Sequence, residues 1–163
     1  MSRIIIVMGV SGSGKTTLGK ALAKTLDCTF LEGDAFHSVA NKDKMKKGTP
    51  LTDEDRLPWL KKINTVLKQG SEKPMVLACS ALKNEYRKQL SEQLPHNAIL
   101  WVYLNGEFSE LKKRMEKRNH FMPSSLLQSQ LETLEPPKEA IKLDCSLSIE
   151  VMIQQLKSHL DEQ

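Results

Sequence analysis

The stretch GVSGSGKT at residues 9–16 decides the fold, because it fits the phosphate-binding pattern G-x-x-x-x-G-K-[ST] at every defined position. It follows a β-branched apolar run, RIIIVMG at residues 3–9, and precedes Leu18, Leu22 and Leu26 at helical spacing. A strand, a glycine-rich turn and a helix in this order point backbone N–H groups at a phosphate. The sequence therefore predicts a nucleotide site here, with a purely structural glycine turn as the alternative.

The residue types in this loop have separate tasks. Glycines let the chain wrap around a phosphate, Lys15 can bridge the β- and γ-phosphates of ATP, and the Thr16 hydroxyl can hold Mg²⁺. We expect the ATP-binding residues to be Gly9, Val10, Ser11, Gly12, Ser13, Gly14, Lys15, Thr16 and Thr17, together with Arg114.

Further apolar runs alternate with helical patterns along the rest of the chain. Strands are predicted at residues 28–34, 73–80, 98–106 and 140–146, and a strongly periodic helix closes the sequence at residues 149–160. Strands of continuous apolar residues alternating with helices indicate a parallel sheet covered on both faces. We expect one α/β domain over residues 1–163.

Composition excludes several classes of protein. The 163 residues carry a net charge of +4, and the 24 basic residues are scattered, so no nucleic-acid partner is expected. No apolar stretch approaches the length of a membrane span. Cys28, Cys79 and Cys145 lie far apart among apolar neighbours, which is typical of buried reduced thiols in a cytoplasmic protein.

A phosphate-binding loop serves switches and motor ATPases as well as kinases for small acceptors. The guanine-reading pattern N-K-x-D is approached only by NKDK at residues 41–44, which ends in lysine and follows the wrong strand. The strand at residues 73–80 lacks the acid that usually closes a Walker B strand. Both absences favour a small-molecule kinase.

Two acids follow the second predicted strand, in EGD at residues 32–34. The carboxyl edge of an open α/β sheet is where ligands bind. Asp34 is therefore the candidate to accept or orient the proton of an acceptor hydroxyl, and Glu32 the candidate to touch Mg²⁺ through water. The alternative is that both acids merely end the strand.

Four segments resemble the gluconate kinases, a family related to shikimate kinases and nucleoside monophosphate kinases. They are GVSGSGKTT, EGDAFHSVANKDKMKKGTPLTDEDRLPWL, CSALKNEYR and HFMPSSLLQSQLETLEPP. The resemblance implies ATP-dependent phosphorylation of D-gluconate to 6-phosphogluconate. It also implies a P-loop kinase fold with a parallel sheet in the order 2-3-1-4-5, and a homodimer. The family often has glycine where this chain has Asn119.

The segment LTDEDRLPWL at residues 51–60 combines a helix start with a candidate acceptor contact. Arg56 offers a planar donor fork suited to the carboxylate of gluconate, and a salt bridge to the neighbouring acids is the alternative. The acids at residues 53–55 suit a helix N-terminus that begins between Thr52 and Leu57. The preceding basic segment at residues 41–50 matches no regular element, whereas Trp59 and Leu60 are expected in the core.

Other polar residues near the same sheet edge complete the expected substrate site. His37 follows Asp34 by three residues, with a solvated loop histidine as the alternative, and the basic residues after the third strand have surface charge as theirs. The expected substrate-binding residues are Asp34, His37, Arg56, Ser80, Ala81, Lys83, Arg87 and His120.

An insertion at about residues 119–137 is interpreted as a lid that excludes water during phosphoryl transfer. Its leucines predict a short helix starting near Ser124 and stopped by Pro136. Arg114 and Arg118, at its leading edge, are expected to neutralise the transferring phosphoryl group, with a solvated helix end as the alternative. Lys15, Asp34 and Arg118 form the expected catalytic set. A kinase for another small anion such as shikimate, and a non-catalytic nucleotide sensor, remain rival hypotheses.

Overall fold

The computed structural model describes residues 3–117 and 123–162, which fold around a parallel sheet. The sheet has five strands in the order β2-β3-β1-β4-β5, and every neighbouring pair is parallel, as predicted. The strands are β1 (Ile4–Met8), β2 (Thr29–Glu32), β3 (Met75–Ala78), β4 (Ile99–Asn105) and β5 (Ile141–Asp144).

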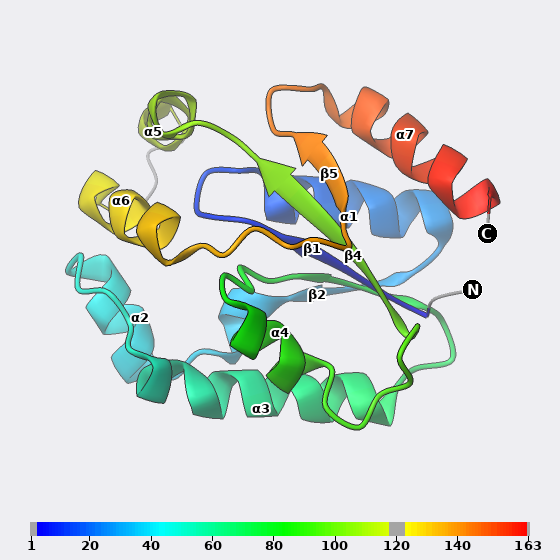
Figure 1. Ribbon diagram of the computed structural model, residues 1–163, viewed down its shortest axis with the longest axis horizontal. Helices are drawn as coiled ribbons and strands as arrows, with labels where there is room; N and C mark the ends of the chain where they lie inside the picture. Colours follow the sequence, from blue (N-terminus) through cyan, green and yellow to red (C-terminus); the bar gives the residue numbers. More distant parts are fainter. Residues whose placement is uncertain (1–2, 118–122, 163) are drawn as a thin grey trace.

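Alternating side chains of the central strand β1 feed two separate apolar layers. Ile4, Ile6 and Met8 pack against α3 (Asp53–Gln69) and α4 (Asn84–Leu90) on one face. Ile5 and Val7 pack against α1 (Lys15–Leu26) and α7 (Ile149–Asp161) on the other. Figure 1 shows the sheet between these two helix pairs. Burial on both faces explains why the strand is apolar throughout.

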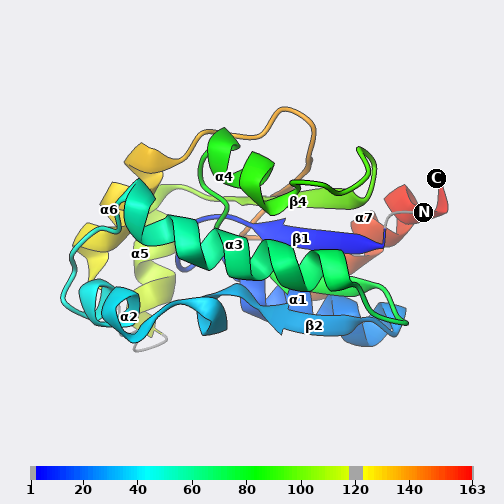
Figure 2. The same ribbon diagram turned by 90° about the horizontal axis from the view of Figure 1, so that it is seen from below.

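Three helices and a short 3-10 turn gather where the strands end. These are the turn at Gly33–Phe36, α2 (Val39–Lys46), α5 (Phe108–Lys117) and α6 (Ser124–Thr133). Figure 2 shows α2, α5 and α6 together at the end of the sheet toward which the arrowheads of β1 and β2 point. The carboxyl edge of the sheet, where a ligand site was expected, is therefore enclosed by elements distant in sequence.

The segment at residues 41–50 was expected to be irregular, and this was wrong. Helix α2 covers most of it, and the Ser38 hydroxyl caps it by accepting the Asn41 N–H at 3.1 Å. Asn41 and Met45 are its buried residues. Because only these two anchor the helix, it lacks the apolar stripe by which a sequence pattern is recognised.

The start of α3 agrees with the expected range. Thr52 caps the helix by accepting the Asp55 N–H at 3.0 Å, and Asp55 Oδ2 accepts the Thr52 N–H at 2.9 Å. The reciprocal pair satisfies two orphan N–H donors. Pro58 lies inside the helix, one turn beyond its start. Trp59 and Leu60 are buried, as predicted.

The predicted thiol and membrane features can also be compared with the structure. All three cysteines are free, and Cys79 and Cys145 are buried, whereas Cys28 is only half-buried. Among the residues described, no helix combines the length and apolarity that a membrane span requires.

Candidate active site

The phosphate-binding loop joins β1 to α1 and depends on left-handed glycines. Gly9, Gly12 and Gly14 have φ values of 149°, 81° and 96°, which side chains rarely allow. A Cβ atom on Gly12 would lie 2.9 Å from Met115 Cγ, so α5 also packs tightly on the loop. Val10 and Ser13 are buried, and Ser13 Oγ donates to the Val10 carbonyl at 2.7 Å.

Lys15 begins α1 and carries the loop's positive charge. Its Nζ donates a hydrogen bond to the Val10 carbonyl at 3.0 Å. Burial lowers the pKa of Lys15, whereas nearby Asp34, Cys79 and Glu32 act to raise it. An anion such as a triphosphate would favour the charged form in this setting.

The hydroxyl of Thr16 and the carboxylate of Glu32 meet at the same edge. Thr16 Oγ1 donates to Glu32 Oε2, and Glu32 Oε1 accepts the Asp34 N–H at 3.4 Å. Hard oxygen donors of this kind, a hydroxyl beside a carboxylate, are those that Mg²⁺ prefers. The residues present therefore fit the expected metal site. Thr17 is exposed on α1.

A small cavity of about 40 Å³ lies between the loop, the end of β2 and α6. Its lining comes from distant segments of the chain: Ser11, Lys15, Asp34, Met45, Leu51, Arg56, Ser80, Leu82, Leu126 and Gln130. Lys15, Asp34, Arg56 and Ser80 were predicted to share one site, and they border this one cavity. Larger hollows of about 610 and 880 Å³ lie elsewhere, and neither is lined by Lys15 or Asp34.

Arg56 borders the cavity with part of its guanidinium already held. Nη1 donates to the Leu51 carbonyl at 2.9 Å and to the Tyr86 hydroxyl at 3.0 Å. The ion pairs in the described residues do not involve Arg56, so the alternative of a salt bridge to residues 53–55 is not realised there. Among the described residues, no hydrogen bond uses Nη2 or Nε of Arg56, so these two nitrogens are available as a donor fork.

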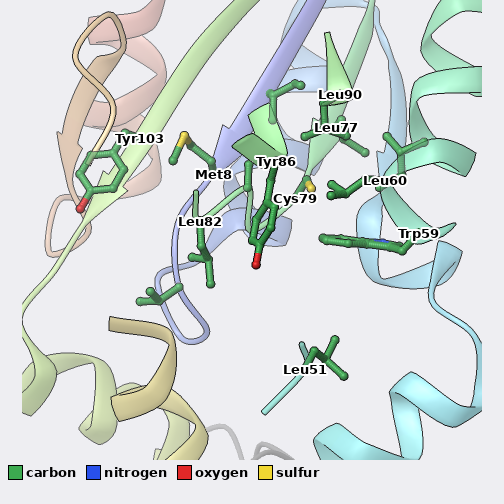
Figure 3. Close-up of a cluster of buried hydrophobic side chains, with 14 of the residues drawn as sticks. Met8, Leu51, Trp59, Leu60, Leu77, Cys79, Leu82, Tyr86, Leu90 and Tyr103 are labelled. Atoms are coloured by element: carbon green, nitrogen blue, oxygen red, sulfur yellow. The ribbon is translucent and has the colours of Figure 1, made fainter. Parts of the chain in front are cut away.

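Tyr86 supports Arg56 from the other side. Its ring lies 5.2 Å from the Arg56 Cζ, and its hydroxyl donates to Asp53. Figure 3 shows the ring among buried apolar side chains that include Leu82 and Leu60. The Tyr86 hydrogen bond, followed by that of Lys83, lowers the pKa of Asp53. In the sequence, Leu82, Tyr86 and Leu90 are spaced four residues apart, which predicts a helix face but not the contact with Arg56.

Lys83 and Arg87, both expected to bind substrate, do not line the cavity. Lys83 Nζ pairs with Asp53 at 3.1 Å. Arg87 is buried, and its Nη1 and Nη2 donate to the carbonyls of Ala81 at 2.6 Å and Glu135 at 2.8 Å. Neither residue borders the cavity, so their part in substrate binding stays a prediction that this placement does not support. Ala81 is likewise buried, with its carbonyl held by Arg87.

His37 is buried with 8% of its surface exposed, so the alternative of a solvated loop histidine is wrong. Its ring stacks on Trp59 at 4.0 Å, and Nδ1 lies 3.3 Å from the Asn41 amide nitrogen. Burial lowers the pKa of His37 to about 4, although Asp34 acts in the opposite direction. The imidazole is thus neutral at pH 7, and His37 is not among the residues that line the cavity.

Arg114 reaches the phosphate-binding loop from α5. Its Nη1 lies 3.8 Å from the position of a Cβ on Gly14. It also donates to the Cys145 carbonyl, and its Nε lies 3.8 Å from Glu110 Oε1. Arg118, Asn119 and His120 lie outside the described residues.

Gln130, on α6, was missed by the sequence interpretation. Its Oε1 accepts the N–H of Ser11 at 2.8 Å, which joins the lid helix to the phosphate-binding loop. The leucines of α6 predicted a helix, but nothing in the pattern indicates which polar side chain faces the cavity.

Comparison with known proteins extends these observations. Residues 11–150 match the family described as shikimate kinase. A gluconokinase from Gluconobacter oxydans is 44% identical, over 96% of this chain and 90% of that protein.

Two solved structures are also similar. A gluconokinase from Sinorhizobium meliloti has 45% identity and a TM-score of 0.87, covering 97% of this chain and 91% of the other. An unliganded sugar kinase from Janibacter has 42% identity and a TM-score of 0.91, covering 99% and 95%.

Proposed function

Since the chain belongs to the shikimate kinase family and, within it, to the gluconokinases, we propose that it transfers the γ-phosphoryl group of ATP to the terminal hydroxyl of D-gluconate. The products are ADP and 6-phospho-D-gluconate. The protein is an enzyme and a kinase, and gluconate metabolism is its setting.

One observation carries the assignment of roles. A phosphate-binding lysine, a carboxylate and an arginine border one cavity, although Lys15, Asp34 and Arg56 come from three separate segments. A nucleotide sensor has no need for the last two groups at this place. A sugar acid needs both, one at its reacting hydroxyl and one at its carboxylate.

The reaction then requires positioning and charge neutralisation rather than covalent help. The loop amides and Lys15 hold the phosphates, and Arg114, with Arg118, neutralises charge on the transferring group. Asp34 orients the acceptor hydroxyl and takes its proton as the new P–O bond forms and the bond to ADP breaks. Arg56 holds the far carboxylate, and Ser80 meets the polyol.

The metal belongs to the same proposal. Thr16 and Glu32 are the residues that would hold Mg²⁺, Glu32 through water. Bound there, Mg²⁺ supplies positive charge to the phosphate oxygens.

Three broader features complete the proposal. We infer a single kinase domain whose lid spans about residues 119–137, and a homodimer testable by sedimentation. An ATP substrate and free thiols support a cytoplasmic location.

A panel of acceptors tests the function. The protein is incubated with Mg-ATP and D-gluconate, other sugar acids, shikimate or nucleoside monophosphates, and ADP release is followed. Release stimulated by gluconate supports the proposal. Release with a different acceptor favours the rival kinase, and no acceptor-stimulated release favours the nucleotide sensor.

A further inference from the structure

One side chain of helix α6, that of Gln130, contacts the nucleotide loop and also lines the acceptor cavity. Gln130 Oε1 accepts the Ser11 N–H at 2.8 Å, and both residues line the cavity that Asp34 and Arg56 also border. The donor is a backbone N–H, so the contacting atom of the side-chain amide must be its oxygen. The orientation of the amide follows from this contact.

The other half of the amide has no such engagement. A side-chain amide carries two N–H donors on its nitrogen. Among the described residues, the Gln130 nitrogen has no hydrogen-bond partner, whereas Gln128 on the same helix donates to Glu132 at 3.2 Å. The Gln130 side chain is half-buried, so donors of this kind favour a ligand or water as partner.

The cavity lining shows what that ligand needs. Arg56 and Asp34 offer charged groups for the two ends of a sugar acid, but much of the wall between them is apolar, formed by Met45, Leu51, Leu82 and Leu126. The hydroxyls in the middle of the sugar chain lose water on entry and need partners. Gln130 and Ser80 supply uncharged polar groups to this lining.

Helix α6 is held firmly enough to place such a donor. Beyond its end, the Glu135 N–H donates to the Leu82 carbonyl at 2.8 Å, and Glu135 Oε1 accepts the Asn84 N–H at 2.8 Å. At its start, a Cβ on Gly48 would lie 3.2 Å from Pro123 Cγ, so the α2–α3 connection touches the helix. Both ends of α6 are thus fixed to acceptor-side segments.

We propose that Gln130 determines acceptor specificity by donating from Nε2 to one hydroxyl in the middle of the gluconate chain, while its oxygen holds the phosphate-binding loop. This inference rests on the proposed function, because it takes gluconate as the acceptor that the residues of this lining contact. The same side chain then links a filled acceptor site to the loop that grips ATP.

The test compares Gln130→Leu with Gln128→Leu, a matched change on the exposed side of the same helix. The Gln130 variant should raise the KM for gluconate roughly tenfold, the size of one uncharged hydrogen bond, with the KM for ATP within about twofold. The Gln128 variant should behave like the wild type. Both are then assayed with gluconates that lack a single hydroxyl at C2, C3, C4 or C5.

With one deoxy analogue, the wild type and Gln130→Leu should have the same KM, because the hydroxyl that Gln130 contacts is already missing. If Gln130→Leu raises KM by the same factor with every analogue, Gln130 acts only by holding the lid, and the inference fails. A Gln130→Leu enzyme with wild-type KM for gluconate also overturns it. If the wild type ignores gluconate altogether, the proposed function fails first, and this inference with it.

Discussion

At the scale of single residues, four basic side chains expected to bind ligands differ in their position and in their contacts within the protein. Lys15 and Arg56 both border the acceptor cavity. Lys15 donates to a loop carbonyl, whereas Nη2 and Nε of Arg56 have no hydrogen-bond partner in the part of the chain that the structure describes. Lys83 and Arg87 were also expected to bind substrate, with surface charge as the alternative, and they contact Asp53 and backbone carbonyls. Position at the cavity therefore separates Lys15 and Arg56 from Lys83 and Arg87.

Replacing Lys15 by alanine should lower kcat by about 10² or more, as loss of a preorganised charge contact does. The free energy of unfolding should not decrease in the variant, because the substitution removes an amine that is desolvated in the folded protein. Steady-state kinetics and urea denaturation measure the two effects. Lys24→Ala, at an exposed position of the same helix, is the control, and turnover of Lys15→Ala at its level would remove the assignment.

Arg56→Ala should raise the KM for gluconate by roughly 10- to 100-fold, the range for a hydrogen bond to a charged group. The KM for ATP should stay within about twofold. Initial rates with each substrate varied in turn separate the two constants. Lys62→Ala, at an exposed position of α3, should leave both unchanged. An effect confined to ATP would show that Arg56 serves the nucleotide.

Burial of neutral His37 should make stability depend on pH between about 6.5 and 4. In this window the unfolded chain binds a proton that the folded protein does not, so the free energy of unfolding rises with pH. It should fall by on the order of 3 kcal/mol between pH 7 and pH 4, given about 1.4 kcal/mol per pKa unit.

Urea denaturation across that range measures the slope. His37→Phe keeps a ring against Trp59 but cannot titrate, so its slope should be smaller. His96→Gln, at an exposed position, should keep the wild-type slope. Equal slopes in all three proteins would contradict the explanation.

At the scale of elements, helix ends position the site more than helix interiors do. Asp55 closes the capping box of α3, and it also accepts from Lys44 of α2 at 2.9 Å, which lowers the pKa of Asp55 to about 2. One carboxylate thus caps one helix and ties it to the next. The acids at residues 53–55, interpreted mainly as structural, have that role for Asp55 and a contact to Tyr86 for Asp53.

Thr52→Ala should lower the free energy of unfolding by about 1 kcal/mol, because the first turn of α3 loses its cap. The same substitution at Thr65, exposed within that helix, should be neutral or slightly stabilising, since alanine has the higher helix propensity. Thermal and urea denaturation of the two variants compare them directly. Equal losses would show that the capping box contributes nothing measurable.

At the scale of the whole molecule, the site exists because the parallel sheet brings the ends of β1, β2 and β3 to one edge. Helix α6, more than a hundred residues after the phosphate-binding loop, then closes over that edge through Gln130 and Leu126. Ligands that bridge these segments should stabilise the fold as a unit.

Mg-ATP at about 100 times its dissociation constant should add about 2.7 kcal/mol to the free energy of unfolding. ATP with a chelator should add less if Thr16 and Glu32 hold the metal. Thermal unfolding with each addition measures this, with Mg²⁺ alone as the control. In Glu32→Gln the advantage of Mg-ATP over chelated ATP should shrink, and an undiminished advantage would place the metal elsewhere.

The sequence by itself determined the parallel sheet and the nucleotide loop, because apolar runs and the spacing of GVSGSGKT are local signals. The strand order was expected only from the resemblance to the gluconate kinases, and the structure confirms it. It also placed Lys15, Asp34 and Ser80 at one edge, because parallel strands end together, whereas Arg56 was assigned to the site by the fit of its donor fork to a carboxylate. Only the tertiary structure decided that α2 is a helix with two buried residues, that Arg87 donates to backbone carbonyls, and that Gln130 accepts a hydrogen bond from the phosphate-binding loop. These features depend on contacts between residues that are far apart in the sequence, and a local sequence pattern carries no information about such contacts.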